Sequence, residues 1–218
     1  MRRPVFIARQ GRHPYGWLGA IIGRIMASET AADNDRAIAM LGVLSEEHVL
    51  DVGTGHGRSL ATLAAAADNV TATGIDASDV MLTIARRRHK ALIRQGRVRV
   101  ERASSDDLPF AAATFDRVMA VHTLYFWQPA APHLKSMARV LKPGGRVVLG
   151  FRPAEDAALT ARFPASVYAF RTTAEVEALL ATAGLVIVDR QCRDVPGNSM
   201  VWLAATPARQ PVLPGTGT

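Results

Sequence analysis

The stretch Val49-Leu-Asp-Val-Gly-Thr-Gly-His-Gly-Arg-Ser59 decides the fold of this 218-residue chain. Its apolar opening, residues 49–52, is typical of a buried parallel strand. A helix-like segment, residues 57–67, follows the glycines. Glycine tolerates positive φ and lets a ligand approach the backbone, and a helix N-terminus exposes unpaired N–H groups. We therefore expect a strand, a tight ligand-binding turn and a helix, with the turn built on three alternating glycines, Gly53, Gly55 and Gly57.

An acidic residue ends the next apolar run, Val70 to Ile75, about twenty residues beyond the glycine turn. An acid there, Asp76, can accept hydrogen bonds from both hydroxyls of a ribose. The glycines fall as G-x-G-x-G, whereas the dinucleotide fingerprint reads G-x-G-x-x-G. Asp51 stands two residues before the first glycine. The spacing disfavours a nicotinamide-dependent oxidoreductase, which stays open as an alternative.

The stretch resembles motif I of the class I S-adenosylmethionine-dependent methyltransferases, of the bacterial, small-molecule type. In that family the first acid, here Asp51, helps to place the amino acid part of the cofactor, and the glycine loop passes beside it. The resemblance implies S-adenosylmethionine as the cofactor. The segment Arg139-Val-Leu-Lys-Pro-Gly-Gly145 is similar to the family's helix-end turn before strand five, where Pro143 would stop the helix.

A third segment, Asp106-Asp-Leu-Pro-Phe110, resembles the part of the family that faces the adenine. Relatives carry an acid–alanine pair shortly before Leu-Pro-Phe, whereas this chain has Ser104 and Ser105. A serine hydroxyl can still accept a hydrogen bond, and Asp106 could take over the role of the acid. The predicted cofactor-binding residues are Asp51, Gly53, Thr54, Gly55, Gly57, Asp76, Ala77, Met81, Ser104, Ser105, Asp106 and His122.

From His48 onward, strand-like and helix-like segments alternate, which favours a parallel sheet covered on both faces. The final link, residues 193–198, is so short that the last two strands must be antiparallel. We predict an α/β fold with a doubly wound, seven-stranded, mostly parallel sheet of the Rossmann-like methyltransferase kind and extra N-terminal helices. The expected strands are 48–52, 70–75, 97–102, 116–122, 145–151, 185–191 and 199–206, and the expected helices are 57–67, 78–94, 129–141 and 172–183. The expected helix caps are Ser78, Thr172 or Thr173 with Glu175, and Gly184.

We interpret residues 1–218 as one methyltransferase domain, with an N-terminal arm and helices in 1–47, the α/β core in 48–206 and a disordered tail in 207–218. Residues 1–16 are expected to form an extended or mobile arm. Helices are expected over Trp17–Ala27 and Ala32–Leu44. These helices could simply pack on the sheet, or the segment Gly11–Asn34 could close over the cofactor and form part of the acceptor pocket. An amphipathic membrane contact is a third possibility, which the shortness of the segment disfavours.

The fourth strand leads into Ala120-Val-His-Thr-Leu-Tyr-Phe-Trp127, at the edge of the sheet where ligands bind. His122 could be a general base, but we prefer it as a wall of the cofactor site. Tyr125 is a second catalytic candidate, and Tyr125, Phe126 and Trp127 could either line a pocket or pack under the next helix. Methyl transfer from a sulfonium mainly needs alignment, so the lack of a catalytic triad or metal-ligand cluster is consistent with it. We predict no metal and a small-molecule acceptor with an N, O or C nucleophile.

Composition and charge limit the partners and the cellular location that we expect for this chain. The net charge of +7 rests mostly on arginine, and the densest basic group follows a predicted helix without interleaved aromatic residues, which disfavours nucleic acid. One cysteine, Cys192, excludes an internal disulfide framework. No apolar run reaches the roughly 18 residues of a membrane span, and no secretory signal is visible, so we expect a cytoplasmic protein without stable membrane insertion. The oligomeric state stays open, and so does a cofactor-binding protein of this fold without turnover.

Overall fold

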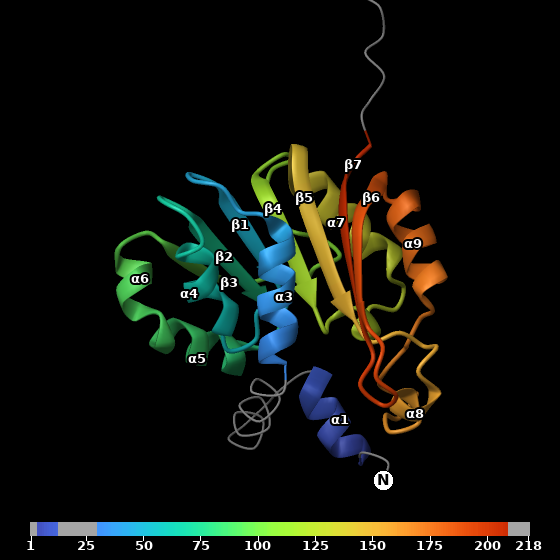
Figure 1. The fold of residues 1–218 in the computed structure, drawn as a ribbon. Helices are drawn as coiled ribbons and strands as arrows, with labels where there is room; N and C mark the ends of the chain where they lie inside the picture. The colour runs from blue at the N-terminus through green and yellow to red at the C-terminus, as the bar shows by residue number, and fades with distance from the viewer. Residues whose placement is uncertain (1–3, 13–29, 209–218) are drawn as a thin grey trace, which may run out of the picture.

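A seven-stranded sheet forms the centre of the computed structural model, which describes residues 4–12 and 30–208 (Figure 1). The strand order is β3-β2-β1-β4-β5-β7-β6, and only β7 runs antiparallel to its neighbours. This arrangement confirms the predicted fold class. The strands are β1 (His48–Val52), β2 (Thr71–Asp76), β3 (Val98–Arg102), β4 (Phe115–Val121), β5 (Leu141–Phe151), β6 (Leu185–Arg193) and β7 (Met200–Pro207).

Helices cover both faces of the sheet, because the strands bury alternate residues on opposite sides. Along β4, Val118 and Ala120 join the core under α7 and α9, while Met119 and Val121 join the core under α3, α4 and α5. The helices are α1 (Val5–Arg12), α3 (Ala31–Leu41), α4 (Arg58–Ala64), α5 (Asp79–Arg88), α6 (Lys90–Arg94), α7 (Ala131–Val140), α8 (Ala157–Thr160) and α9 (Thr173–Thr182), with a short 3₁₀ turn η1 (Leu124–Phe126).

The helix starts predicted from capping residues lie where the sequence placed them. The Ser78 side chain accepts a hydrogen bond from the backbone N–H of Met81 at the start of α5. Thr172, and not Thr173, caps α9, and the Glu175 carboxylate accepts a hydrogen bond from the backbone N–H of Thr172. Such reciprocal bonds satisfy two backbone N–H groups that the helix itself leaves open.

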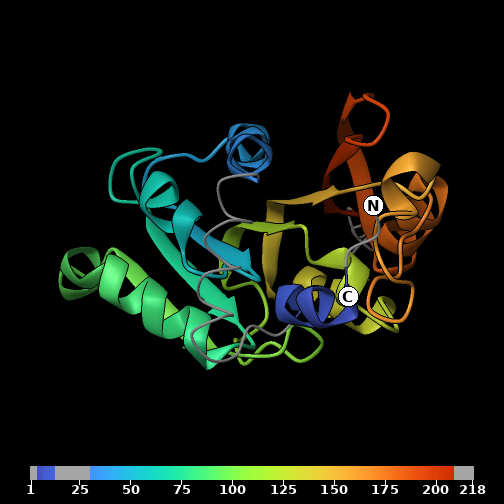
Figure 2. The same ribbon diagram turned by 90° about the horizontal axis from the view of Figure 1, so that it is seen from below.

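Two expected elements are wrong in detail. The single helix predicted over 78–94 is divided at His89, whose buried ring reaches the Gly57 carbonyl with Nε2 (2.6 Å). The extended arm predicted over 1–16 instead contains α1, whose Ala8 is 1% exposed and belongs to the core. Seen from below, α1 lies beyond the carboxyl ends of the parallel strands (Figure 2).

The turn expected before strand five also differs from the structure. Helix α7 ends at Val140, three residues before Pro143, and β5 starts at Leu141. The register between β4 and β5 shifts there, so the Pro-Gly-Gly sequence forms an irregularity within β5. The segment between β5 and α9 contains α8 and an aromatic group described below.

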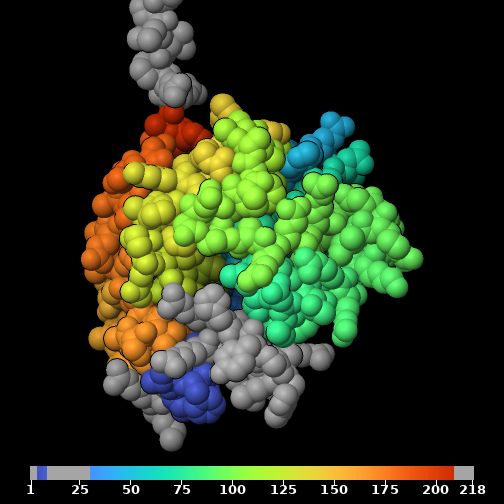
Figure 3. Space-filling view, turned by 180° about the vertical axis from the view of Figure 1, so that it is seen from behind, coloured from blue at the N-terminus to red at the C-terminus, as the bar shows by residue number. Residues whose placement is uncertain are grey.

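Some expectations fall outside the described residues, namely the helix over Trp17–Ala27 and the tail beyond residue 208. No helix in the described part of the chain is long and apolar enough to cross a membrane. The basic residues of α5 and α6 are exposed on one flank, coloured green in the view from behind (Figure 3). Cys192 is also exposed, contrary to the buried position usual for a cysteine on a late strand.

Candidate functional site

The glycine turn after β1 is fixed on the neighbouring strand by backbone hydrogen bonds. The N–H groups of Gly53 and Thr54 both donate to the carbonyl of Ile75, each at 2.9 Å. Gly53 and Gly55 have φ values of 75° and 56°, a region that side chains with a Cβ rarely adopt. A Cβ on Gly53 would lie 2.2 Å from the Thr123 methyl group, whereas a Cβ on Gly55 would enter open space. The turn therefore leaves room beside Gly55 for a ligand.

That room is part of a cavity of about 440 Å³ at the carboxyl ends of β1, β2 and β4. Its volume lies within the range of small-molecule sites. The cavity brings together eleven of the predicted cofactor residues: Asp51, Gly53, Thr54, Gly55, Asp76, Ala77, Met81, Ser104, Ser105, Asp106 and His122.

Gly57 and Tyr125 do not line this cavity. Gly57 has a φ of 75° and precedes α4, and a Cβ there would touch Ala85 and the His89 ring, so it packs α4 against α5. Tyr125 is buried beneath the cavity wall and contacts His122. Neither position favours direct contact with a ligand.

Asp51 is a buried carboxylate at the inner end of the cavity, only 3% exposed. Its Oδ2 accepts hydrogen bonds from the hydroxyls of Thr54 (2.7 Å) and Ser59. Burial raises the pKa of Asp51, the hydroxyls oppose that effect, and the nearby Asp76 raises it further. No basic side chain of the described residues forms an ion pair with Asp51. A cationic ligand would relieve the cost of burying this charge.

Asp76 is the last residue of β2 and connects the cavity to the glycine turn. Its Oδ2 accepts from the Gly55 N–H (2.9 Å), and its Oδ1 accepts from the Ser78 N–H (2.8 Å). A carboxylate oxygen can accept more than one hydrogen bond, so this arrangement is compatible with donation from ribose hydroxyls. The same residue that would hold a ligand also holds the loop beside it.

Polar and aromatic residues form the other end of the cavity, next to Ser104 and Asp106. Trp127 stacks on His133 with ring centroids 4.8 Å apart and planes 6° apart. His133 Nδ1 lies 2.7 Å from the Ser105 hydroxyl. Burial lowers the pKa of His133, and the nearby Asp106 partly offsets this. His133 was not among the predicted site residues, because a lone histidine at the start of α7 carries no motif.

His122 directly follows β4 and has a left-handed conformation, with φ of 60°, which is uncommon for a residue other than glycine. Its Nδ1 lies 2.5 Å from the Tyr125 hydroxyl, and its Nε2 lies 2.9 Å from Asp33 Oδ2. Burial lowers the pKa of His122, although Asp33 partly opposes this. Because protein groups contact both ring nitrogens, the geometry favours His122 as a wall of the cofactor site over His122 as a general base.

Asp33 and two other residues near the start of α3 were not predicted as site residues. Asp33 is 2% exposed and holds His122 from behind, while Thr30 and Asn34 line the cavity. The segment Gly11–Asn34 was expected to cover the cofactor, and these residues are its described end. Closure by the rest of that segment stays a prediction, because residues 13–29 lie outside the described chain.

Taken together, these residues fit an adenosyl cofactor that carries positive charge. The cavity has a buried carboxylate, a second carboxylate bonded to the glycine turn, and open space beside Gly55. Among the described residues, no group of three or more histidine, cysteine or acidic side chains could hold a metal.

Comparison with known proteins agrees with this geometry. Residues 49–145 match the family described as a methyltransferase domain. The uncharacterized methyltransferase YdaC of Bacillus subtilis is 32% identical over 135 residues, which cover 62% of this chain and 72% of YdaC. The chain belongs to the class I S-adenosylmethionine-dependent methyltransferases.

A second relative of this methyltransferase is the demethylmenaquinone methyltransferase of Tropheryma whipplei, 43% identical over 113 residues that cover 52% of this chain and 45% of that protein. Apart from YdaC, the first curated relatives are thus matched over about half of their length or less.

Solved structures share the fold. The methyltransferase bound to the Trm112 activator of Haloferax volcanii has a TM-score of 0.76 at 20% identity, covering 96% of this chain and all of that one. The geranyl diphosphate C-methyltransferase of Streptomyces coelicolor, solved with S-adenosyl-L-homocysteine, has a TM-score of 0.68 at 18% identity, covering 82% and 77%. The family assigns S-adenosylmethionine to this methyltransferase as its cofactor.

Proposed function

We propose that this methyltransferase acts on an oxygen or carbon atom of a small, planar, largely apolar acceptor such as a phenol or a quinol. The observation that carries the proposal is that one cavity has both polar and aromatic lining. Asp51 and the glycine turn supply polar groups, and Phe126 and Trp127 supply an aromatic wall. Apolar and aromatic walls with few polar groups are typical of sites for small organic ligands.

The aromatic wall is reinforced from behind. Phe126 is partly buried, and its ring centroid lies 5.0 Å from that of Tyr168 and 5.8 Å from that of Tyr125. Phe163 and Phe170 extend this group through rings 4.9 and 5.8 Å from Tyr168. Packed aromatic pairs are stabilised by about 0.5–1.5 kcal/mol beyond burial, so the wall is held in place. A planar acceptor could lie against Phe126 without deforming the site.

The bound cofactor supplies the methyl group on a positively charged sulfur, which is already an activated leaving group. The residues of this chain bind and align. Asp51 and Asp76 favour the cationic cofactor, and the ring of His122 limits its position. Because both nitrogens of His122 contact protein groups, we infer that the acceptor arrives as an acidic hydroxyl or enol that loses its proton without this residue.

The name of the Tropheryma relative supports the choice of acceptor, because demethylmenaquinone is a quinone. The proposal does not extend to nucleic acid, and none of the basic residues of α5 and α6 lines the cavity.

The test has two stages. Isothermal titration should show binding of S-adenosylmethionine and S-adenosylhomocysteine and none of NAD. The protein is then incubated with methyl-labelled cofactor and matched panels of phenols, naphthoquinols, aliphatic alcohols and amines. Transfer to phenols or quinols supports the proposal, and transfer confined to amines contradicts it. Binding without transfer to any panel would favour the alternative of a cofactor-binding protein without turnover, and binding of NAD alone would favour an oxidoreductase.

A further inference from the structure

A buried polar cluster lies directly behind the cavity wall and joins three distant parts of the chain. We call Asp33, His122, Tyr125 and Arg193 the Asp33 cluster. Asp33 Oδ1 accepts from Arg193 Nη1 (2.7 Å), and Asp33 Oδ2 lies 2.9 Å from His122 Nε2. The other ring nitrogen, Nδ1, lies 2.5 Å from the Tyr125 hydroxyl. The cluster thus links α3, the end of β4 and the strand β6.

The hydrogen-bonding capacities of these groups determine where the protons lie. An arginine only donates and an ionised carboxylate only accepts, so Asp33 accepts one hydrogen bond from Arg193 and another from His122 Nε2–H. Hydrogen bonds from His122 and Arg193 lower the pKa of Asp33, against the effect of burial, which would raise it. A neutral His122 then has a bare Nδ1 that accepts from the Tyr125 hydroxyl. Burial raises the pKa of Tyr125, so its hydroxyl stays protonated and donates a hydrogen bond to His122 Nδ1.

The backbone of α3 is tied to the same place. The indole N–H of Trp202 on β7 donates to the Asp33 carbonyl (3.0 Å), and the Arg193 guanidinium lies 5.7 Å from the centroid of the Trp202 ring. Arg193 also donates to the carbonyl and side chain of Asn198. Asp33 is therefore held from three sides, which a residue that merely fills space does not require.

We propose that Asp33 is a positioning residue that fixes the orientation of the His122 ring and keeps its proton on Nε2, so that the ring forms the wall beside the positive sulfur of the cofactor. Only the binding measurements described below depend on the assigned cofactor, whereas the NMR measurement of the ring proton does not. The position also affects the glycine turn, because the residue after His122, Thr123, places its methyl group where a side chain on Gly53 would lie. A displaced His122 would therefore displace Thr123 and disturb the turn.

Several charged groups face His122 and shift its pKa in opposite directions. Burial lowers its pKa most, Arg152 and Arg193 lower it further, and Asp33 raises it. The cavity beyond contains Asp51 and Asp76. A protonated His122 would repel the sulfonium of S-adenosylmethionine but not the neutral thioether of S-adenosylhomocysteine. The ratio of the two affinities should therefore fall as pH decreases, by up to about tenfold per pH unit below the His122 pKa.

The deciding variant is Asp33→Asn in the full-length chain. Arg193 still needs an oxygen acceptor, so the amide nitrogen must face His122, and the ring proton moves from Nε2 to Nδ1. ¹⁵N NMR of histidine-labelled protein reads this tautomer directly, with His122→Asn identifying the signals. Asp35→Asn is the matched control, since Asp35 is exposed on the same helix. We expect the Nε2–H pattern in the wild type and in the control, and the inverted pattern in Asp33→Asn.

The second readout is the pH dependence of the ratio of S-adenosylmethionine affinity to S-adenosylhomocysteine affinity. We call the pH range in which this ratio falls on acidification its acid limb. Asp33→Asn removes an anion that raises the His122 pKa and should move the acid limb to lower pH, whereas Arg193→Met removes a cation that lowers this pKa and should move the acid limb to higher pH. Arg193→Met retains the carboxylate and must keep the Nε2–H pattern, which leaves the proposal testable if Asp33→Asn does not fold. An unchanged tautomer in folded Asp33→Asn, or acid limbs that coincide in Arg193→Met and the wild type, would overturn it. Failure of both cofactors to bind would contradict the assigned function and leave the NMR result to decide the role of Asp33.

Discussion

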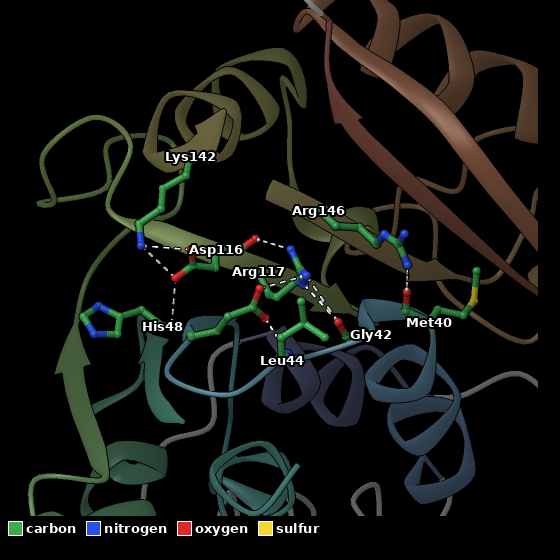
Figure 4. Close-up of polar contacts among 9 residues, drawn as sticks. Met40, Gly42, Leu44, His48, Asp116, Arg117, Lys142 and Arg146 are labelled. Carbon is green, nitrogen blue, oxygen red and sulfur yellow. Dashed lines mark hydrogen bonds and ion pairs between the residues drawn. The ribbon is translucent and has the colours of Figure 1, made fainter. Parts of the chain in front are cut away.

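The two ends of the parallel sheet use their charged residues differently. At the amino end, charges from separate elements neutralise one another (Figure 4). Asp116 at the start of β4 accepts from Lys142 at 2.8 and 2.9 Å and from the His48 backbone at 2.9 Å. Arg117 and Glu47 form an ion pair of 2.8 Å in which both side chains are largely buried. Arginines also close the end of α3, because Arg117 and Arg146 donate to its last carbonyl groups.

At the carboxyl end, the buried acid Asp51 has only hydroxyl partners among the described side chains. The turn beside it holds Gly55 at positive φ with open space around it. Burying a charge without a countercharge costs free energy, and a fold retains such a feature only where something else repays the cost. The difference indicates that the charged groups at the amino end stabilise the fold, whereas Asp51 at the carboxyl end lacks a countercharge, which a cationic ligand would supply.

The largest effect that would test this contrast comes from adding the same side chain at both ends. Gly55→Val should reduce cofactor affinity by more than about a hundredfold, because the branched side chain fills the space beside the turn and cannot easily adopt its φ. Gly144→Val is the matched control at the amino end, since Gly144 also has positive φ (79°) and open space around it. Both variants bear similar backbone strain, about 1–2 kcal/mol.

Calorimetric binding of S-adenosylhomocysteine, with circular dichroism to check the fold, measures the outcome. We expect Gly144→Val to unfold at a lower temperature and to bind normally. A folded Gly55→Val that binds with wild-type affinity would show that the glycine turn is not the cofactor loop.

The second effect compares one carboxylate from each end. Asp76→Ala should weaken cofactor binding by about 1.5–3 kcal/mol, the scale of hydrogen bonds to a charged group. Asp116→Ala should leave binding unchanged and lower the free energy of unfolding by about 1–2 kcal/mol, because Lys142 and the His48 N–H lose their acceptor. The partners of Asp116 hold its pKa below the usual value although burial alone would raise it, which agrees with a stabilising role.

Titration calorimetry and urea unfolding of both variants separate the two roles. The comparison fails if Asp116→Ala weakens cofactor binding as much as Asp76→Ala does. It also fails if Asp76→Ala stays folded and binds as the wild type.

Local signals explain which parts of this structure could be predicted from the sequence. The glycine spacing, the acid after β2 and the cap at Thr172 act over a few residues, so the strand, the turn and the helix starts could be predicted. The interruption of the long helix at His89 could not, because its cause is a hydrogen bond to Gly57, 32 residues away.

The same reason limits prediction of the site. Asp33 and His122 are 89 residues apart, and the pairing of Ser105 with His133 spans 28 residues. Neither contact has a spacing that a sequence motif could express, since it depends on how α3 and α7 pack on the sheet. The role of the aromatic residues between β5 and α9 likewise could not be predicted, because it depends on the contact between Tyr168 and Phe126 that folding creates.

The smallest effect concerns Asp156, an acid near the carboxyl end of the sheet that contributes to stability and not to the cavity. Burial would raise its pKa, but the backbone N–H groups of Gly197, Ser199 and Leu159 lower it to about 2 from 3.8. Their donor–acceptor distances are 3.0, 3.1 and 2.9 Å. Because its carboxylate oxygens accept hydrogen bonds from these backbone groups, Asp156 joins α8 to the β6–β7 connection. Asp156→Asn should therefore leave cofactor affinity unchanged.

Asp156→Asn should instead lower the free energy of unfolding at pH 7 by about 1–2 kcal/mol, a value reduced for partial exposure of the carboxylate. Because the folded pKa lies below the unfolded one, the stabilisation is fully present above pH 3.8 and is lost as pH falls toward about 2. Urea unfolding of both proteins at pH 7, 5 and 3 should therefore show equal gaps at pH 7 and 5 and a narrower gap at pH 3. A gap that stays constant down to pH 3 would mean that the charge of Asp156 is not what holds α8 to the hairpin. Weakened cofactor binding in this variant would instead show that the carboxyl end does not separate its structural acid from its ligand-binding acids.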